Sequence, residues 1–370
     1  MTSSSESFGG FDPPLIEESP PSATNGEAAA PLESVAPPEP AAPPEPAAPL
    51  GETPAGPPGS RTGARSGAFD AYSIGDPGRA FTHAVPLPET RHADTHDYVV
   101  DAATISDPGG VPRLILRAAS GRGLAHQQYG DPRQDDHAFA LSGDGEYLVG
   151  VVADGVSSGE WSHLAARVAT EEGSAHVAAL LRTTAPEDVA WRDVLSLLAE
   201  RLRDVCATLP GGAAQVDLGW HEVATLMATT VVIGVVATRP DDHGEHAVTL
   251  VRLGDTSAWV LHPADGWVAL GEVKNAGNVI AESATACLPL VPDADPLVVQ
   301  TTIPQGAVLL LLTDGVGDPL GGGRGEVGAV LQCWWQTPPH PLEFAAQACF
   351  GRKTFDDDRG ALGVWPVTSP

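Results

Sequence analysis

The sequence predicts an α+β fold in which antiparallel β-sheets carry helices on their outer faces. Short extended runs of apolar residues form two groups, and a pair of amphipathic helices separates them. Several of these runs follow one another through tight Gly-containing turns, which join antiparallel neighbours. The chain lacks the regular alternation of strand and helix that indicates a parallel sheet.

The first 60 residues do not belong to this fold. They contain 15 of the 35 prolines, nine acidic residues and no Lys or Arg, and the hexamer PPEPAA occurs twice in tandem over 37–48. Such a segment buries too little apolar surface to offset the entropy lost on ordering. We expect a disordered tail over 1–65, a transitional segment without assigned structure over 66–112, and one folded domain over 113–367.

The first half of the domain combines strands with two helices. A strand beginning near Arg113 opens it, and strands at 138–141 and 146–152 flank Gly-Asp-Gly, a typical hairpin turn. Two helices follow, one over 160–182 and one beginning near Pro186, because apolar residues recur there at spacings of three and four. Acidic residues in the first turn of the second helix suit the helix dipole.

Extended runs dominate the second half. We expect strands over 229–237, 248–253, 258–262, 267–270, 297–303, 308–312 and 361–365, a long loop over 272–296, and one helix over 342–349.

The composition limits the possible partners and compartments. The formal net charge is −28, and without the nine acids of the first 60 residues it is still −19, which argues against nucleic acid or an anionic membrane as a partner. No apolar run approaches the roughly 18 residues of a spanning helix, and we expect no secretory signal. The four cysteines form no CxxC pair. We therefore expect a soluble, cytoplasmic protein with free thiols.

Carboxylates stand at the ends of several predicted strands. Asp154 and Asp314 each follow a buried strand and precede a Gly, Asp255 follows another strand, Asp358 precedes the last strand, and Asp135 precedes the strand at 138–141. Asp-Gly is commonly a hairpin turn, but loop and helix follow Asp154 and Asp314. If these strand ends meet, like charges at ~4 Å repel by several kcal/mol unless a cation lies among them. Oxygen ligands without His or Cys favour Mg²⁺ or Mn²⁺ over zinc.

Six segments occur in an order and spacing that resemble a known family. They are RQDDHAFAL (133–141), VVADGVSSGEWSHLAARVATEE (151–172), ATTVVIGVVA (228–237), LVRLGDTSAWVL (250–261), LLLTDGVGDPL (311–320) and DDDRGALGVW (356–365). Together they resemble the motifs of metal-dependent Ser/Thr protein phosphatases of the 2C type (the PPM family), and HQQYGDPRQDD (126–136) is similar to a compact bacterial branch. The resemblance implies a four-layer α-β-β-α sandwich.

The resemblance also implies a site with two core Mg²⁺ or Mn²⁺ ions. Asp154 would bridge both ions, and the carbonyl of Gly155 would bind one of them. Asp314 and Asp358 would hold the other ion. Asp135 would accept a hydrogen bond from a metal-bound water. These residues are the catalytic and metal-binding set that the family motifs predict.

A third, weaker ion would lie near Asp255 and Asp318, and three positions depart from the family pattern. Gly130 occupies the place of the Arg that holds the phosphate in the family, Val156 that of a His found in many relatives, and Ser257 that of an Arg. His126 or Arg133 are alternatives for the missing Arg, although a lone His or Arg is more often structural.

The predicted function is hydrolysis of phosphoserine or phosphothreonine in proteins by a water that two metal ions activate. We expect a monomer, and the resemblance suggests a Ser/Thr kinase as a partner. One alternative is a catalytically weak pseudophosphatase that binds phosphoproteins or kinases. Another is a serine esterase, because Gly155–Gly159 is a G-x-S-x-G segment with Ser157 as nucleophile and Asp314 and His340 as triad partners.

Overall fold

The computed structural model describes residues 72, 74–76, 96–209, 218–271 and 286–367 of the chain. The chain divides into two units, residues 1–66 and 67–370, and all described residues belong to the second. The predicted disordered tail and the part of the predicted long loop over 272–285 lie outside the described residues.

The described residues form two antiparallel sheets packed face to face. The first has six strands in the order β1 (Tyr98–Ser106), β2 (Pro112–Gly121), β11 (Arg359–Pro366), β10 (Val308–Leu312), β7 (Ser257–His262) and β8 (Gly266–Ala269). The second has five strands in the order β3 (Asp135–Leu141), β4 (Tyr147–Gly155), β5 (Thr229–Ala237), β6 (His246–Leu253) and β9 (Val298–Ile303). The predicted antiparallel α+β fold is confirmed.

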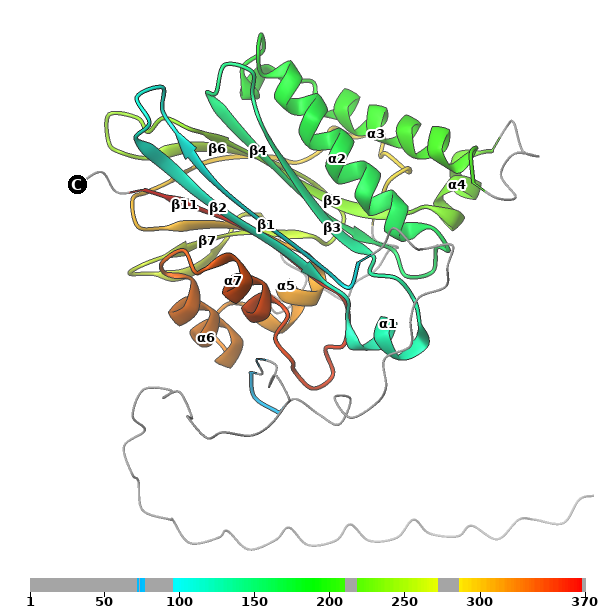
Figure 1. Cartoon of the computed structure of the whole chain (residues 1–370). Helices are drawn as coiled ribbons and strands as arrows, with labels where there is room; N and C mark the ends of the chain where they lie inside the picture. The colour runs from blue at the N-terminus through cyan, green and yellow to red at the C-terminus, as the bar shows by residue number, and fades with distance from the viewer. Residues whose placement is uncertain (1–71, 73, 77–95, 210–217, 272–285, 368–370) are drawn as a thin grey trace, which may run out of the picture. The chain divides into compact units, whose positions relative to one another are not determined.

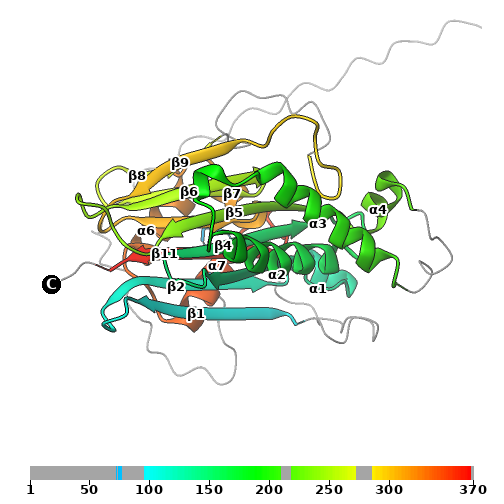
Figure 2. The same ribbon diagram turned by 90° about the horizontal axis from the view of Figure 1, so that it is seen from above.

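Helices cover the outer face of each sheet, which makes four layers (Figure 1). Two long helices, α2 (Ser162–Leu180) and α3 (Trp191–Cys206), lie on the side of the second sheet, and α2 crosses it directly (Figure 2). The first sheet carries α5 (Asp314–Leu320), α6 (Glu326–Trp335) and α7 (Pro341–Ala348). The predicted α-β-β-α sandwich is therefore confirmed.

Alternation along the strands divides the core between the layers, because successive side chains in a strand point to opposite faces. In β4, Val149, Val151 and Ala153 pack toward the helices, whereas Leu148 and Val152 pack between the sheets. The same alternation in β10 and β11 sends odd-numbered and even-numbered residues to different layers. Strands covered on both faces carry nearly continuous apolar runs, as in β5 and β10.

Several local predictions need correction. The first sheet begins with β1, inside the stretch that the sequence left unassigned and ahead of Arg113. Residues Pro186–Asp188 form a short 3₁₀ turn, and α3 begins only at Trp191. The sequence also missed three short helices, which are too brief to show an apolar period: α1 (Leu124–Tyr129), α4 (Trp220–Leu226) and α5.

Across the described residues, no helix combines the length and the apolar character needed to cross a bilayer.

Candidate active site

Three of the predicted carboxylates come together at one end of the sandwich. Asp154 lies near the end of β4, Asp314 is the first residue of α5 directly after β10, and Asp255 lies in the turn that leads from β6 to β7. One carboxylate oxygen from each of the three lies within 4.8 Å of the others. They meet because β4 and β6 belong to one sheet while β7 and β10 belong to the other.

The glycines after Asp154 and Asp314 allow close backbone approach. A Cβ on Gly155 would lie 2.7 Å from the carbonyl oxygen of Ser162 and 2.9 Å from that of Gln134. A Cβ on Gly315 would lie 1.8 Å from the carbonyl oxygen of Asp358. These two Asp-Gly pairs thus place a carboxylate where the chain packs against other backbone, whereas Asp144-Gly145 and Asp265-Gly266 form the hairpin turns that the sequence predicts.

Asp135 lies directly opposite Asp154 in the β3–β4 pair. Its side chain is buried, with 3% of the residue exposed. The hydroxyl of Thr313 donates a hydrogen bond to Oδ2 of Asp135 at 2.7 Å, and Ser120 donates to the Asp135 carbonyl at 2.8 Å. Thr313 continues the alternation of Leu309 and Leu311, so it reaches Asp135 from the opposite sheet.

The clustered acids make ionisation unfavourable in the absence of a counter-charge. Burial, followed by the charge of Asp358, raises the pKa of Asp135 well above its usual range. Burial, followed by the charges of Asp135 and Asp314, does the same for the pKa of Asp154. Burial and the neighbouring charge of Asp357 raise the pKa of Asp314 to about 6. A divalent cation among these oxygens would remove this cost.

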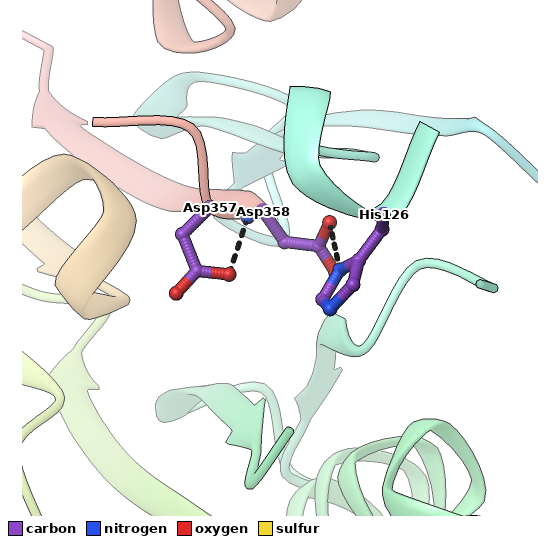
Figure 3. Close-up of side chains that lie close together, drawn as sticks. All are labelled: His126, Asp357 and Asp358. Atoms are coloured by element: carbon purple, nitrogen blue, oxygen red, sulfur yellow. Dashed lines mark hydrogen bonds and ion pairs between the residues drawn. The ribbon is translucent and has the colours of Figure 1, made fainter. Parts of the chain in front are cut away.

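Asp358 lies apart from this group of three. It is 1% exposed, and its oxygens accept hydrogen bonds from the amides of Gly123 and Gln134, both at 2.5 Å. Its Oδ1 also lies 2.8 Å from Nδ1 of His126 (Figure 3). The structure therefore does not bring Asp358 to Asp314, in contrast to the arrangement that the family motif implies.

The preceding residue, Asp357, faces the site instead. Its side chain points away from His126 (Figure 3), while one of its oxygens accepts a hydrogen bond from the amide of Asp358 at 2.8 Å. Asp357 lines a cavity of about 230 Å³ together with Asp314 and Asp318. The sequence shows the three consecutive aspartates but does not distinguish the one that faces the cavity.

The positions that depart from the family pattern have structural explanations. Gly130 ends α1 in the left-handed conformation, with φ of 77°, which disfavours a side chain there. Arg133 is held by the backbone, since it donates hydrogen bonds to the carbonyls of His96 and Asp135. His126 is held by Asp358. The hydroxyl of Ser257 accepts a hydrogen bond from Trp259.

The esterase alternative does not fit this fold. Ser157 lies on an exposed turn before α2, as the sequence segment suggests. However, a nucleophile elbow belongs to the strand–turn–helix of a mostly parallel sheet, and every strand pair around β4 is antiparallel.

Residues 122–337 match the profile of the family described as protein phosphatase 2C. The chain belongs to the protein phosphatase 2C family. It is accordingly a Ser/Thr protein phosphatase of a metal-dependent type. No curated protein sequence matches this phosphatase.

Solved structures resemble this phosphatase at low sequence identity. A phosphatase from a pathogenic strain of Toxoplasma gondii is 14% identical, with a TM-score of 0.49 over 74% of this chain and 98% of that one. A serine/threonine phosphatase from S. agalactiae is 13% identical, with a TM-score of 0.48 over 68% and 99% of the two chains. The catalytic domain of PstP in complex with two manganese ions is 16% identical, with a TM-score of 0.46 over 69% and 99%.

Proposed function

We propose that this phosphatase removes phosphate from phosphoserine and phosphothreonine in proteins at the cavity formed by Asp154, Asp255 and Asp314, with two Mg²⁺ or Mn²⁺ ions as cofactors. The observation that carries the proposal is the approach of three carboxylate oxygens to within 4.8 Å of one another. An all-oxygen set of hard ligands suits Mg²⁺ and Mn²⁺. When bound, such ions lower the pKa of a water and offset charge on the phosphoryl oxygens.

The residues of the chain divide this work. Asp154 and Asp314, with the carbonyl of Gly155, would hold the core ions, and Asp255 and Asp318 would serve a third. The family motif assigns Asp358 to the core site, yet its oxygens already accept three hydrogen bonds. We therefore propose Asp357 as the ligand beside Asp314, since both line the same cavity.

Asp135 would orient a water at the site rather than bind an ion. It is buried beside Asp154, and Thr313 fixes one of its oxygens. The second oxygen can then accept a proton or a hydrogen bond from a water that approaches phosphorus.

The chemistry of the substrate defines the partners in this proposal. A phosphoserine or phosphothreonine residue in a protein is the product of a Ser/Thr kinase, so a kinase must act before this enzyme. A cytoplasmic monomer, as the sequence predicts, completes the proposal.

The test compares hydrolysis of p-nitrophenyl phosphate with Mn²⁺ and with EDTA for the wild type, Asp154→Asn and Asp314→Asn. Asp144→Asn is the matched control, because Asp144 lies at the opposite end of the same hairpin. We expect Mn²⁺-dependent turnover that both active-site variants reduce by at least about a hundredfold and the control retains.

The same variants separate the proposal from a pseudophosphatase. Without Gly130→Arg and Val156→His, the chain lacks two family side chains, which is the observation in favour of that alternative. If Mn²⁺ raises the melting temperature of the wild type alone but nothing is hydrolysed, the protein is a metal-binding pseudophosphatase. If neither effect is seen, the metal site itself is refuted.

A further inference from the structure

Arg359, the first residue of β11, has a buried guanidinium group with spare hydrogen-bonding capacity. The residue is 5% exposed, and its Nη2 donates a hydrogen bond to the carbonyl of Phe355 at 2.6 Å. The guanidinium carbon lies 4.9 Å from the centre of the Phe350 ring. Within the described part of the chain, Nη1 of Arg359 has no hydrogen-bond partner. A buried N–H without a partner is costly, and it marks a place that a ligand could satisfy.

This side chain belongs to the walls of two neighbouring cavities. One is the cavity of about 230 Å³ that Asp314 and Asp357 line, and the other, of about 180 Å³, is lined by Arg122 and Gln127. Arg359 lines both. Of the described side chains around the first cavity, Arg359 is the one with a positive charge, and the charged residues beside it are all aspartates.

A phosphate monoester that enters this acidic cavity needs a cation besides the metal ions. The position of the family's phosphate-binding Arg is Gly130, and Arg133 is committed to backbone carbonyls. An arginine is suited to the role because its guanidinium stays charged and presents several N–H groups in one plane.

We propose that Arg359 binds a non-bridging oxygen of the substrate's phosphoryl group through Nη1, so that β11 supplies the phosphate-binding cation. The inference rests on the proposed phosphatase function, since the substrate must enter the cavity beside Asp314. The ligand chemistry is that of a phosphate dianion, and free inorganic phosphate, the product, shares it.

The test uses Arg359→Gln, Arg359→Lys and the matched control Arg117→Gln in the full chain loaded with Mn²⁺. Arg117 also donates a guanidinium hydrogen bond to a backbone carbonyl, that of Pro339, and it lines neither cavity. Two quantities are measured: the inhibition constant of inorganic phosphate against p-nitrophenyl phosphate, and the shift in melting temperature that phosphate causes. A lost hydrogen bond to a charged group corresponds to about tenfold in affinity.

We expect Arg359→Gln to raise the inhibition constant and KM by about tenfold, and Arg359→Lys by a smaller factor because charge remains without the planar fork. Arg117→Gln should leave both values unchanged. Unchanged phosphate inhibition in a folded Arg359→Gln variant overturns the proposal, and so does an equal loss in Arg117→Gln. If Arg359→Gln does not fold, Arg359→Lys decides: an inhibition constant equal to that of the wild type overturns the proposal.

The measurements also separate this inference from the proposed function. If the wild type shows no Mn²⁺-dependent turnover, the proposed function fails. The phosphate-induced shift in melting temperature still reports on Arg359 in that case: a shift in the wild type that Arg359→Lys reduces supports the subsite, and an equal shift in both contradicts it.

Discussion

Nδ1 of His126 lies 2.8 Å from Oδ1 of Asp358, and both side chains are buried. His126 belongs to α1 and Asp358 to the segment that enters β11, so the contact joins parts of the chain more than 200 residues apart. Asp358 also accepts hydrogen bonds from the amides of Gly123 and Gln134, which flank α1. The pair therefore anchors the α1 loop to the last strand beside the candidate active site.

Replacement of His126 by Phe should destabilise the protein by about 1–3 kcal/mol, because a buried carboxylate loses one of its partners. Burial disfavours the charged imidazole, but the hydrogen bond and the charge of Asp358 outweigh it and raise the pKa of His126. Urea unfolding checks the prediction, with His262→Phe as the control, since His262 pairs with Asp265 near the surface. Equal stability of the two variants would show that the contact contributes nothing.

Replacement of Gly315 by Ala should impair both stability and activity. The new Cβ would lie 1.8 Å from the carbonyl oxygen of Asp358, so α5 must move away from β11 and carry Asp314 with it. Gly173→Ala in α2 is the control, because its Cβ would lie 3.6 Å or more from its nearest neighbours and Ala favours a helix by up to ~1 kcal/mol. Thermal unfolding and p-nitrophenyl phosphate turnover distinguish them; an active, stable Gly315→Ala variant would contradict the packing described.

Thr313→Val should cost about 1–3 kcal/mol, although it nearly preserves the shape of the side chain. The Thr313 hydroxyl donates to Asp135 and accepts a hydrogen bond from the amide of Gly360 at 2.8 Å, so both groups would be left without it. We expect a lower kcat as well, since Asp135 loses the contact that fixes its position. Thr208→Val, at an exposed hydroxyl, should change neither stability nor kcat. A kcat equal to that of the wild type would remove Asp135 from the proposed mechanism.

The metal-free enzyme should lose stability as the pH rises from about 4 to about 6 and above, and Mn²⁺ should reverse the loss. Carboxyl groups titrate near 4 in the unfolded chain, whereas folding raises the pKa of Asp314 to about 6 and that of Asp154 well above its usual range. Over this interval the unfolded state releases protons that the folded state keeps, so unfolding becomes more favourable with rising pH. Melting curves from pH 4 to 8, with EDTA or Mn²⁺, measure the effect.

Asp314→Asn is the control for this pH dependence, because an amide does not titrate. The metal-free variant should lose less stability than the wild type over the same interval. If the two profiles run parallel in EDTA, Asp314 does not carry the strain that its surroundings impose in the structure.

Local patterns predicted much of the architecture. Strands β5 and β10 occupy the ranges that the sequence predicts, and the turns at Asp144-Gly145 and Asp265-Gly266 join the expected hairpins. The exposed edge strand β1 escaped prediction because its apolar and polar residues do not alternate regularly. Its place in the sheet comes from pairing with β2, a contact that only the folded chain provides.

The sequence by itself determined that acidic residues stand where strands end, and that motifs of the protein phosphatase 2C family carry them. Only the tertiary structure decided which of the aspartates Asp356, Asp357 and Asp358 faces the cavity and which is buried against His126. The physical reason is that neighbouring residues of an extended chain point to opposite sides. The register of β11 against β2 and β10 sets that choice, and register depends on partners far away in the chain.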